Sequence, residues 1–287
     1  VEAGGSGAVR RPPFARIGDH EYANTGQEEG PDRAWMRGEA GAGAGSGGVW
    51  LLFGAICLLT LAVRFMQIDD LALPAWVDSV HHTLMVRVAA ERGLAPVDLR
   101  PYLPVAELPY HWGYHVLIAA AYALSGLELP AALLWSGQVL NVLQTVAAGA
   151  LALLCWRRPA AAVGAALITG LISIFPAYYV TWGRYTQLAG LLLLPGLAAA
   201  WAYGLGAHDD PAPAAARRDW WFMAALLLAG LSLIHFRVLI FGLMLIAAQS
   251  IIWALDAPRR RIAGALLVAA LTALGAIALA GPWLALL

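Results

Sequence analysis

The sequence predicts an all-α, polytopic bundle of transmembrane helices, and its composition and its apolar segments support this fold class. Of its 287 residues, 61% are hydrophobic and only 13% are charged, whereas a soluble globular domain is close to half apolar. The mean hydropathy is +0.69. Long apolar segments recur with about the 20 residues that a helix needs to cross a hydrocarbon core of ~30 Å. The chain is therefore expected to be an integral membrane protein.

Seven segments come close to the spanning length. They are residues 49–67, 131–155, 160–180, 187–206, 220–235, 237–255 and 262–282. Residues 112–124 form a shorter apolar stretch, which at ~1.5 Å per residue reaches only ~20 Å. This stretch is either a short span or a helix that lies at the membrane interface.

The arginines favour the interfacial alternative. All 18 basic side chains are arginines, and three clusters lie between spans, at Arg157-Arg158, Arg217-Arg218 and Arg259–Arg261. If 112–124 does not span, these clusters share one side with the arginines of residues 1–48. Cytoplasmic loops are enriched in basic residues. We therefore expect the cytoplasmic membrane, a cytoplasmic N-terminus and an external segment, residues 68–130, that carries two interfacial helices.

The ends of the chain differ in character. Residues 1–48 are rich in Gly, Glu and Arg and are expected to form a disordered cytoplasmic tail. Residues 49–287 are expected to form one transmembrane domain, truncated at its C-terminus because Leu287 lies in an apolar run. The balanced charge gives no reason to expect a nucleic-acid partner. Cys57 and Cys155 both lie in spans, so no disulfide framework is indicated.

An acid and two histidines follow the first span. Pro74 and Gly93 bound an expected helix over 75–92. Within it Asp78 is followed at i+3 and i+4 by His81 and His82, a spacing that predicts one shared face. Such a group can accept a proton, orient a base or share a divalent cation. A metal would need a further ligand, such as Asp70, and a wet face of an interfacial helix remains the alternative.

Three further groups of polar residues belong to the same expected external face. They are Tyr110, His111 and His115 around the start of 112–124, Arg184 and Tyr185 between the third and fourth spans, and His235 and Arg237 between the next two helices. A guanidinium matches a phosphate well, although an arginine at a membrane boundary can also snorkel to water. An aromatic belt and a simple polar turn are the alternatives for the other two groups.

The order of these features resembles the GT-C fold glycosyltransferases. A first span precedes Asp78 on an interfacial helix, and a turn at Leu108-Pro109-Tyr110-His111-Trp112 leads into a second interfacial helix that ends in Ser125-Gly126-Leu127. This superfamily includes protein mannosyltransferases, oligosaccharyltransferase catalytic subunits and lipid A aminoarabinose transferases. The resemblance covers roughly residues 50–285, but Asp78 is followed by Ser-Val-His-His rather than by the more common Glu or Pro, and the Trp-Trp-Asp motif of oligosaccharyltransferases is absent.

The resemblance implies a sugar transferase that uses a polyprenyl-phosphate-linked donor at the external face. Asp78 matches the catalytic or acceptor-orienting aspartate of the family, and His81 or His82 would tune it. Arg184 or Arg237 would stabilise the leaving phosphate, with His235, His111, Tyr110 and Tyr185 as further substrate-binding residues. The expected partners are this donor and membrane lipids. A divalent cation, held by Asp78, His82 and Asp70, stays open as a cofactor. A membrane transporter or flippase of lipid-linked saccharide, or a non-catalytic membrane subunit, stays open as a function.

Overall fold

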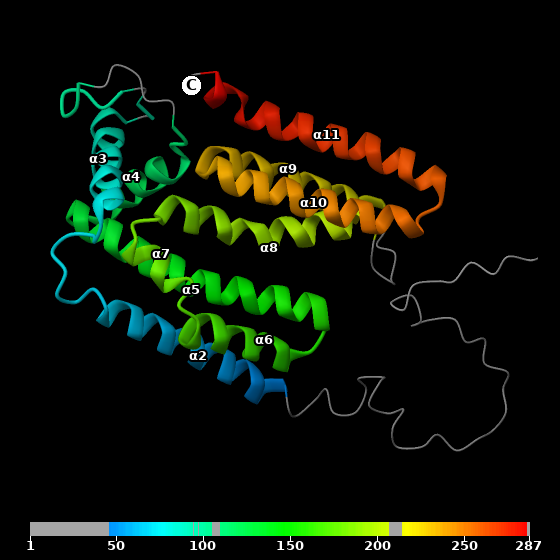
Figure 1. Ribbon diagram of the computed structural model, residues 1–287, viewed down its shortest axis with the longest axis horizontal. Helices are drawn as coiled ribbons and strands as arrows, with labels where there is room; N and C mark the ends of the chain where they lie inside the picture. Colours follow the sequence, from blue (N-terminus) through cyan, green and yellow to red (C-terminus); the bar gives the residue numbers. More distant parts are fainter. Residues whose placement is uncertain (1–45, 94, 97, 105–109, 207–213, 286–287) are drawn as a thin grey trace, which may run out of the picture. The chain divides into compact units, whose positions relative to one another are not determined.

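The computed structural model describes residues 46–285 apart from 94, 97, 105–109 and 207–213 (Figure 1). All regular structure in these residues is helical. The helices are α2 (Ser46–Met66), α3 (Val77–Arg92), α4 (Gly113–Ser125), α5 (Leu129–Trp156), α6 (Pro159–Leu167), α7 (Ala177–Thr181), α8 (Tyr185–Leu205), α9 (Ala214–Ile234), α10 (Phe236–Asp256) and α11 (Arg259–Leu284), with a π-helical turn at Ile168–Ile172 after α6. The predicted all-α class is confirmed.

Six stretches of the described residues are long and apolar enough to cross a membrane. They are Gly47–Met66, Leu129–Trp156, Pro159–Thr181, Tyr185–Leu205, Phe236–Leu255 and Arg261–Trp283. The third combines α6, the π-helical turn and α7. The protein is therefore a multi-pass helical membrane protein. The apolar helix α4 is too short to belong to this group.

The predicted span 220–235 is the one that falls outside this group, so six of the seven predicted spans are matched by length and composition. It forms most of α9, whose beginning carries Arg217, Arg218 and Asp219 and so lowers the mean hydropathy of the helix. Nevertheless α9 runs alongside α8 and α11 (Figure 1). Trp221 near its start lies edge-on against Trp201 of α8.

The expected disordered tail falls largely outside the described residues. Its last three residues, 46–48, form the first turn of α2, which corrects the predicted boundary. The first N–H groups of a helix have no intrahelical partner in any sequence. The apolar run that follows can therefore extend the helix over two glycines at little cost.

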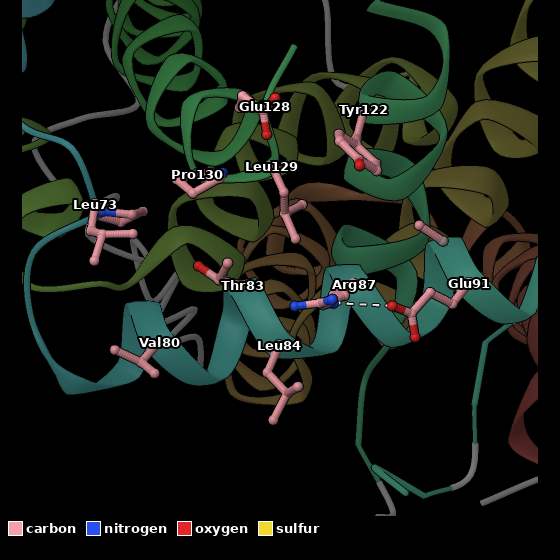
Figure 2. A pocket seen from close by; sticks show the side chains of 12 residues that line it. Leu73, Val80, Thr83, Leu84, Arg87, Glu91, Tyr122, Glu128, Leu129 and Pro130 are labelled. Atoms are coloured by element: carbon pink, nitrogen blue, oxygen red, sulfur yellow. Dashed lines mark hydrogen bonds and ion pairs between the residues drawn. The ribbon is translucent and has the colours of Figure 1, made fainter. Parts of the chain in front are cut away.

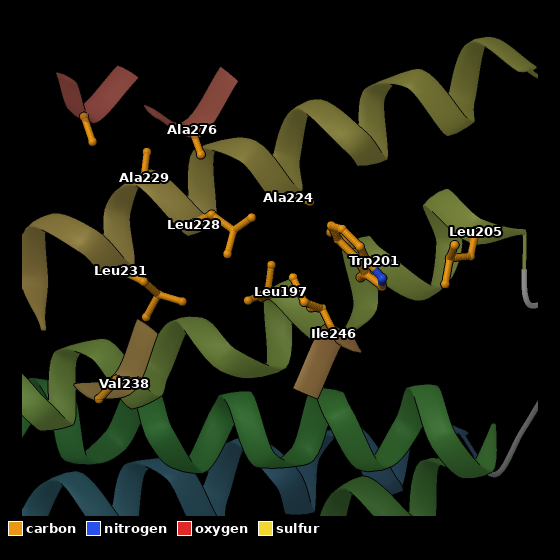
Figure 3. Packing of buried hydrophobic residues seen from close by; sticks show 12 residues of the cluster. Leu197, Trp201, Leu205, Ala224, Leu228, Ala229, Leu231, Val238, Ile246 and Ala276 are labelled. Carbon is orange, nitrogen blue, oxygen red and sulfur yellow. The ribbon is translucent and has the colours of Figure 1, made fainter. Parts of the chain in front are cut away.

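The largest buried cluster joins α8, α9, α10 and α11 (Figure 3). Leu197 and Trp201 of α8 lie against Leu228 and Leu231 of α9, and Ile246 of α10 completes the contact. Helices in lipid associate through close van der Waals packing, which small residues permit. Gly204 is one such residue, since a Cβ there would meet the ring of Trp221 at 2.8 Å.

A polar contact also holds the bundle together. Gln144 of α5 donates a hydrogen bond of 2.7 Å from Nε2 to the backbone carbonyl of Leu188 in α8. Gln138, Asn141 and Gln144 of α5 are all buried. An amide that bridges two helices in this way ties them together where lipid offers no hydrogen-bond partner.

The helix connections alternate between the two ends of the bundle (Figure 1). Segment 67–128, the α7–α8 turn and the α9–α10 junction lie at one end, which we call the site end. The ends of α5, α8 and α10 and the starts of α6, α9 and α11 lie at the other end. The three arginine clusters are at this second end, which we call the arginine end.

Candidate functional site

Helix α3 presents the predicted acid and histidines on different sides. It begins at Val77 and ends where Gly93 takes a left-handed conformation with φ 67°, close to the predicted range 75–92. His82 is buried with 6% of its surface exposed, whereas His81 is exposed. Neighbouring residues point ~100° apart around a helix. Because Val86 and Ala89 turn one side of α3 toward the bundle, His82 enters it and His81 is separated from it, which corrects the predicted shared face.

Asp78 forms an ion pair with Arg184 from the turn between α7 and α8. Nη1 of Arg184 lies 2.9 Å from Oδ2 of Asp78, and each side chain keeps 35% of its surface exposed. The guanidinium also lies 4.5 Å from the ring centroid of Trp182, within the range of a cation–π interaction. The pair is thus held in place and still open to a ligand.

Gly183 brings Arg184 to Asp78. It has φ 69°, and a Cβ at this position would lie 2.8 Å from Oγ and 2.9 Å from the backbone N of Ser79. Any other residue here would be strained by the positive φ, and its side chain would collide with the first turn of α3. A glycine before an arginine indicates a tight turn in the sequence, but it does not indicate which segment the turn approaches.

His82 pairs with His115 of α4. Nδ1 of His82 and Nε2 of His115 are 2.8 Å apart, and both rings are buried. One nitrogen must donate and the other accept, so at least one ring is neutral. Burial lowers the pKa of His82 to about 4 and the pKa of His115 well below its ordinary value. The pair is therefore uncharged at neutral pH.

A second group of rings lies where α4 meets the α9–α10 junction. Tyr110 stacks on His111 at 3.9 Å between ring centroids, and the ring of His111 lies 4.8 Å from that of His235. His235 is the N-cap of α10, and its Nδ1 accepts a hydrogen bond of 3.4 Å from the N–H of Val238. Burial, followed by the effect of His235, lowers the pKa of His111 to about 3.

Tyr110 connects the two groups. Burial raises the pKa of its hydroxyl, a hydrogen bond with Thr186 opposes this, and the charges of Asp78, Arg184 and Arg237 also act on it. Arg237 itself is exposed, 5.9 Å from the ring centroid of Phe236. The structure therefore brings together most of the predicted site residues, namely Asp78, Tyr110, His111, Arg184, His235 and Arg237.

Tyr185 differs from its expected role at a substrate surface. Its side chain is fully buried, and its ring stacks on Tyr114 at 6.3 Å with the ring of His82 at 6.2 Å. Tyr185 lies behind the site because it begins α8, whose first turn packs into the bundle.

The possible metal ligands do not assemble. Within the part of the chain that the structure describes, no three His, Cys, Asp or Glu side chains form a group that could hold a metal ion. Asp70 is exposed in the loop after α2. Asp78 contacts Arg184 and His82 contacts His115, so the expected ligand set Asp78, His82 and Asp70 is corrected.

Asp98 forms a buried ionic contact that no sequence pattern indicates. Its carboxylate is buried between two arginines, 2.8 Å from Nη2 of Arg92 and 2.7 Å from Nη2 of Arg100. Hydrogen bonds from Arg100 and then Arg92 hold its pKa well below the usual range. The three residues fasten the segment after α3, and their spacing of six and two residues matches no helical face that a sequence pattern reveals.

A cavity of about 640 Å³ lies between α3, the end of α4 and the start of α5 (Figure 2). Its walls are largely apolar and include Val80, Leu84 and Leu129, with Arg87 and Glu91 at one side. Nε of Arg87 lies 3.0 Å from Oε1 of Glu91. Val80 is exposed on α3, so the cavity lies along the face of α3 that does not enter the bundle.

Comparison with known families gives one match. The model of a family of unknown function, DUF6541, matches residues 3–287 and so covers nearly the whole chain. No curated protein matches the sequence, and no solved structure matches it.

Proposed function

We propose that this protein, which belongs to the DUF6541 family of unknown function, is a membrane glycosyltransferase. It would move a sugar from a polyprenyl-phosphate-linked donor to an acceptor at the external face of the cytoplasmic membrane, with its N-terminus in the cytoplasm. The observation that carries the proposal is the partly exposed Asp78–Arg184 ion pair at one end of a helix bundle, with Arg237 near enough to act on the same Tyr110 hydroxyl as this pair. A carboxylate can act as the general base of a sugar transfer, and guanidiniums can stabilise the phosphate that leaves.

In the proposed reaction, an acceptor hydroxyl attacks the anomeric carbon of the donor. The bond from this carbon to the phosphate oxygen breaks, and the polyprenyl phosphate leaves with the bonding electron pair. Asp78 accepts the proton of the acceptor hydroxyl as a general base. In sum, one bond from the anomeric carbon to oxygen breaks and another forms, and the acceptor proton passes to Asp78.

Arg184 can serve both the base and the leaving group. Its Nη1 contacts Asp78, and a guanidinium has five N–H donors in a planar fork. It can thus hold a phosphate while it keeps the carboxylate in position. Arg237 is exposed nearby and would add a second positive charge, which stabilises the charge that develops on the phosphate.

His82 is assigned a positioning role in this proposal. It lies one turn after Asp78, and its ring is fixed by His115 at 2.8 Å. Because both rings are neutral and buried, they anchor the first turns of α3 to α4 without adding a charge near the carboxylate. His81 is exposed on another side of α3 and has no role in the proposed reaction.

The cavity beside α3 would give the polyprenyl chain a path to the site. Its apolar walls suit an isoprenoid, and it lies along α3, the helix whose first turn carries Asp78. The phosphate of a donor held there would reach Arg184 around the first turn of α3. The resemblance to GT-C glycosyltransferases supports the same arrangement, with two helices, α3 and α4, between the first two spans.

The test is donor turnover by the purified full-length protein in proteoliposomes. The probes are polyprenyl phosphates that carry labelled mannose, glucose or arabinose, with a membrane extract as the source of acceptors, and release of polyprenyl phosphate is measured. Loss of a general base costs about 10²–10⁴-fold. Asp78→Asn is therefore expected to lower turnover at least ~100-fold, while Arg184→Gln should weaken donor use as well.

Asp69→Asn is the matched control, because Asp69 is an exposed acid in the loop after α2. It should keep wild-type turnover. Equal turnover by the wild type and Asp78→Asn would remove Asp78 from the mechanism. A wild type that uses none of the donors would contradict the proposed reaction class.

A further inference from the structure

A second cavity lies at the arginine end, far along the helices from the candidate site. It has a volume of about 850 Å³ and is lined by residues at the end of α8, in the first part of α9 and between Arg261 and Gly275 of α11, and by Trp253 of α10. No residue of this cavity belongs to the proposed catalytic group. The cavity is therefore separate from the candidate site.

Three arginines from two helices line the cavity. They are Arg217 and Arg218 of α9 and Arg261 of α11, all exposed. Arg217 crosses the end of α8, where its Nη1 would lie 3.7 Å from a Cβ on Gly206. Arg218 has a contact of 3.6 Å with Asp219, but both side chains are more than 70% exposed, and such pairs are weak.

The helix ends add to this positive charge. Both α9 and α11 begin at the arginine end, and the N-terminal end of a helix carries a partial positive charge. The partial negative charge at the C-terminal end of a helix would offset the charge of nearby arginines, but these arginines lie at N-terminal ends, where there is no such offset. An anion in the cavity would therefore be attracted by the helix ends as well as by the guanidiniums.

The deeper walls of the cavity are apolar and are formed by small residues. Along α11 they include Gly264, Ala265, Val268 and Gly275, and a Cβ on Gly264 would meet no atom within 4 Å. From residue 261 to residue 275 a helix rises ~21 Å, which exceeds half of a hydrocarbon core of ~30 Å. The cleft is thus long enough for an acyl chain of one leaflet.

We propose that this cavity binds an anionic phospholipid, with the phosphate of the headgroup on Arg217, Arg218 and Arg261 and an acyl chain along α11. Basic pockets between membrane helices are suited to such headgroups. A zwitterionic lipid would offer the same chains but a weaker match of charge. The site is independent of the proposed catalytic reaction.

The experiment is native mass spectrometry of the full chain in detergent, with added phosphatidylglycerol or phosphatidylcholine. The wild type should retain phosphatidylglycerol at least ~10-fold more strongly. Each arginine near a membrane surface contributes about fivefold to the affinity for an anionic lipid. Arg217→Gln/Arg261→Gln should therefore lower phosphatidylglycerol affinity about 25-fold and leave phosphatidylcholine affinity unchanged.

Two further variants separate this cleft from general surface attraction. Arg158→Gln removes an exposed arginine of the same end that does not line the cavity, and it should change neither affinity by more than about twofold. Gly264→Leu fills the cleft without changing the charge and should lower retention of both lipids. Full retention in Gly264→Leu would mean that headgroup charge alone attracts the lipid, and displacement by millimolar inorganic phosphate would indicate a site for free anions. Either result, or equal retention of the two lipids by the wild type, would overturn the proposal.

Discussion

At the residue level, burial separates the predicted histidines. His82, His111 and His115 are buried, and their pKa values lie below the ordinary value for histidine. His81 has the same chemistry and an adjacent place in the sequence, but it is exposed. The sequence could identify all four as possible proton carriers. Only the packing of α3 on α4 distinguishes a neutral buried pair from an exposed side chain.

These shifts predict that the folded protein is sensitive to acid. The pKa of His82 is 6.5 in an unfolded chain and about 4 in the fold, and that of His111 is about 3. Between these values the unfolded chain binds more protons, so its free energy falls relative to the folded state as pH decreases. The melting temperature in detergent should be constant from pH 8 to 7 and should fall steadily from pH 6.5 to 4.

Variants on α3 test the source of this acid sensitivity. His82→Gln removes one of the buried groups and should flatten the profile below pH 6.5, even if the variant is less stable at pH 7.5. His81→Gln is the control and should keep the wild-type profile. A wild-type melting temperature that does not change between pH 7 and 4 would show that burial of these histidines does not govern stability.

At the element level, the helix ends near the site were predictable, but the contact of the α7–α8 turn with α3 was not. The ends of α3 and α4 followed from Gly93 and Gly126, which both take left-handed conformations, and the predicted ranges were accurate to about two residues at these ends. The contact between the α7–α8 turn and the first turn of α3 could not be predicted. It joins residues more than a hundred positions apart, and nothing local in either segment specifies the other.

Two glycines with the same backbone conformation test the α7–α8 turn. Gly183 and Gly93 have φ 69° and 67°, so alanine at either costs ~1–2 kcal/mol in backbone strain. At Gly183 a Cβ would also collide with Ser79, whereas at Gly93 no atom lies within 4 Å. Gly183→Ala should therefore displace Arg184 and lower donor turnover at least ~10-fold, the effect expected of a misplaced reactive group.

Gly93→Ala is the control for strain alone. It should lower the melting temperature without a comparable loss of turnover per folded molecule. Equal turnover in the two variants would contradict the idea that the close approach at Gly183 holds Arg184 on Asp78.

At the level of the whole molecule, the alternation of connections places the arginine clusters at one end and the candidate site at the other. The positive-inside rule then predicts which end faces the cytoplasm. Asp70 and Arg158 are both exposed and belong to opposite ends of the bundle. They provide matched positions for labelling.

The orientation is tested by single cysteines in a chain that lacks Cys57 and Cys155. In intact cells an impermeant thiol reagent should label Asp70→Cys and should label Arg158→Cys only after the membrane is opened. Labelling in the reverse order would invert the proposed topology and would place the candidate site in the cytoplasm. Donor turnover by the cysteine-free chain confirms that it is folded.

The sequence by itself determined the helical class, the membrane location and most helix boundaries, because apolar length, Gly and Pro act locally. It also identified Asp78 and Arg184 as separate candidates. Only the tertiary structure decided that these two meet, that His82 turns inward to His115, and that Tyr185 lies behind the site. Only it showed Asp98 between Arg92 and Arg100. The physical reason is that burial and pairing depend on which faces of distant helices come together, and a pattern within one segment carries no information about the other.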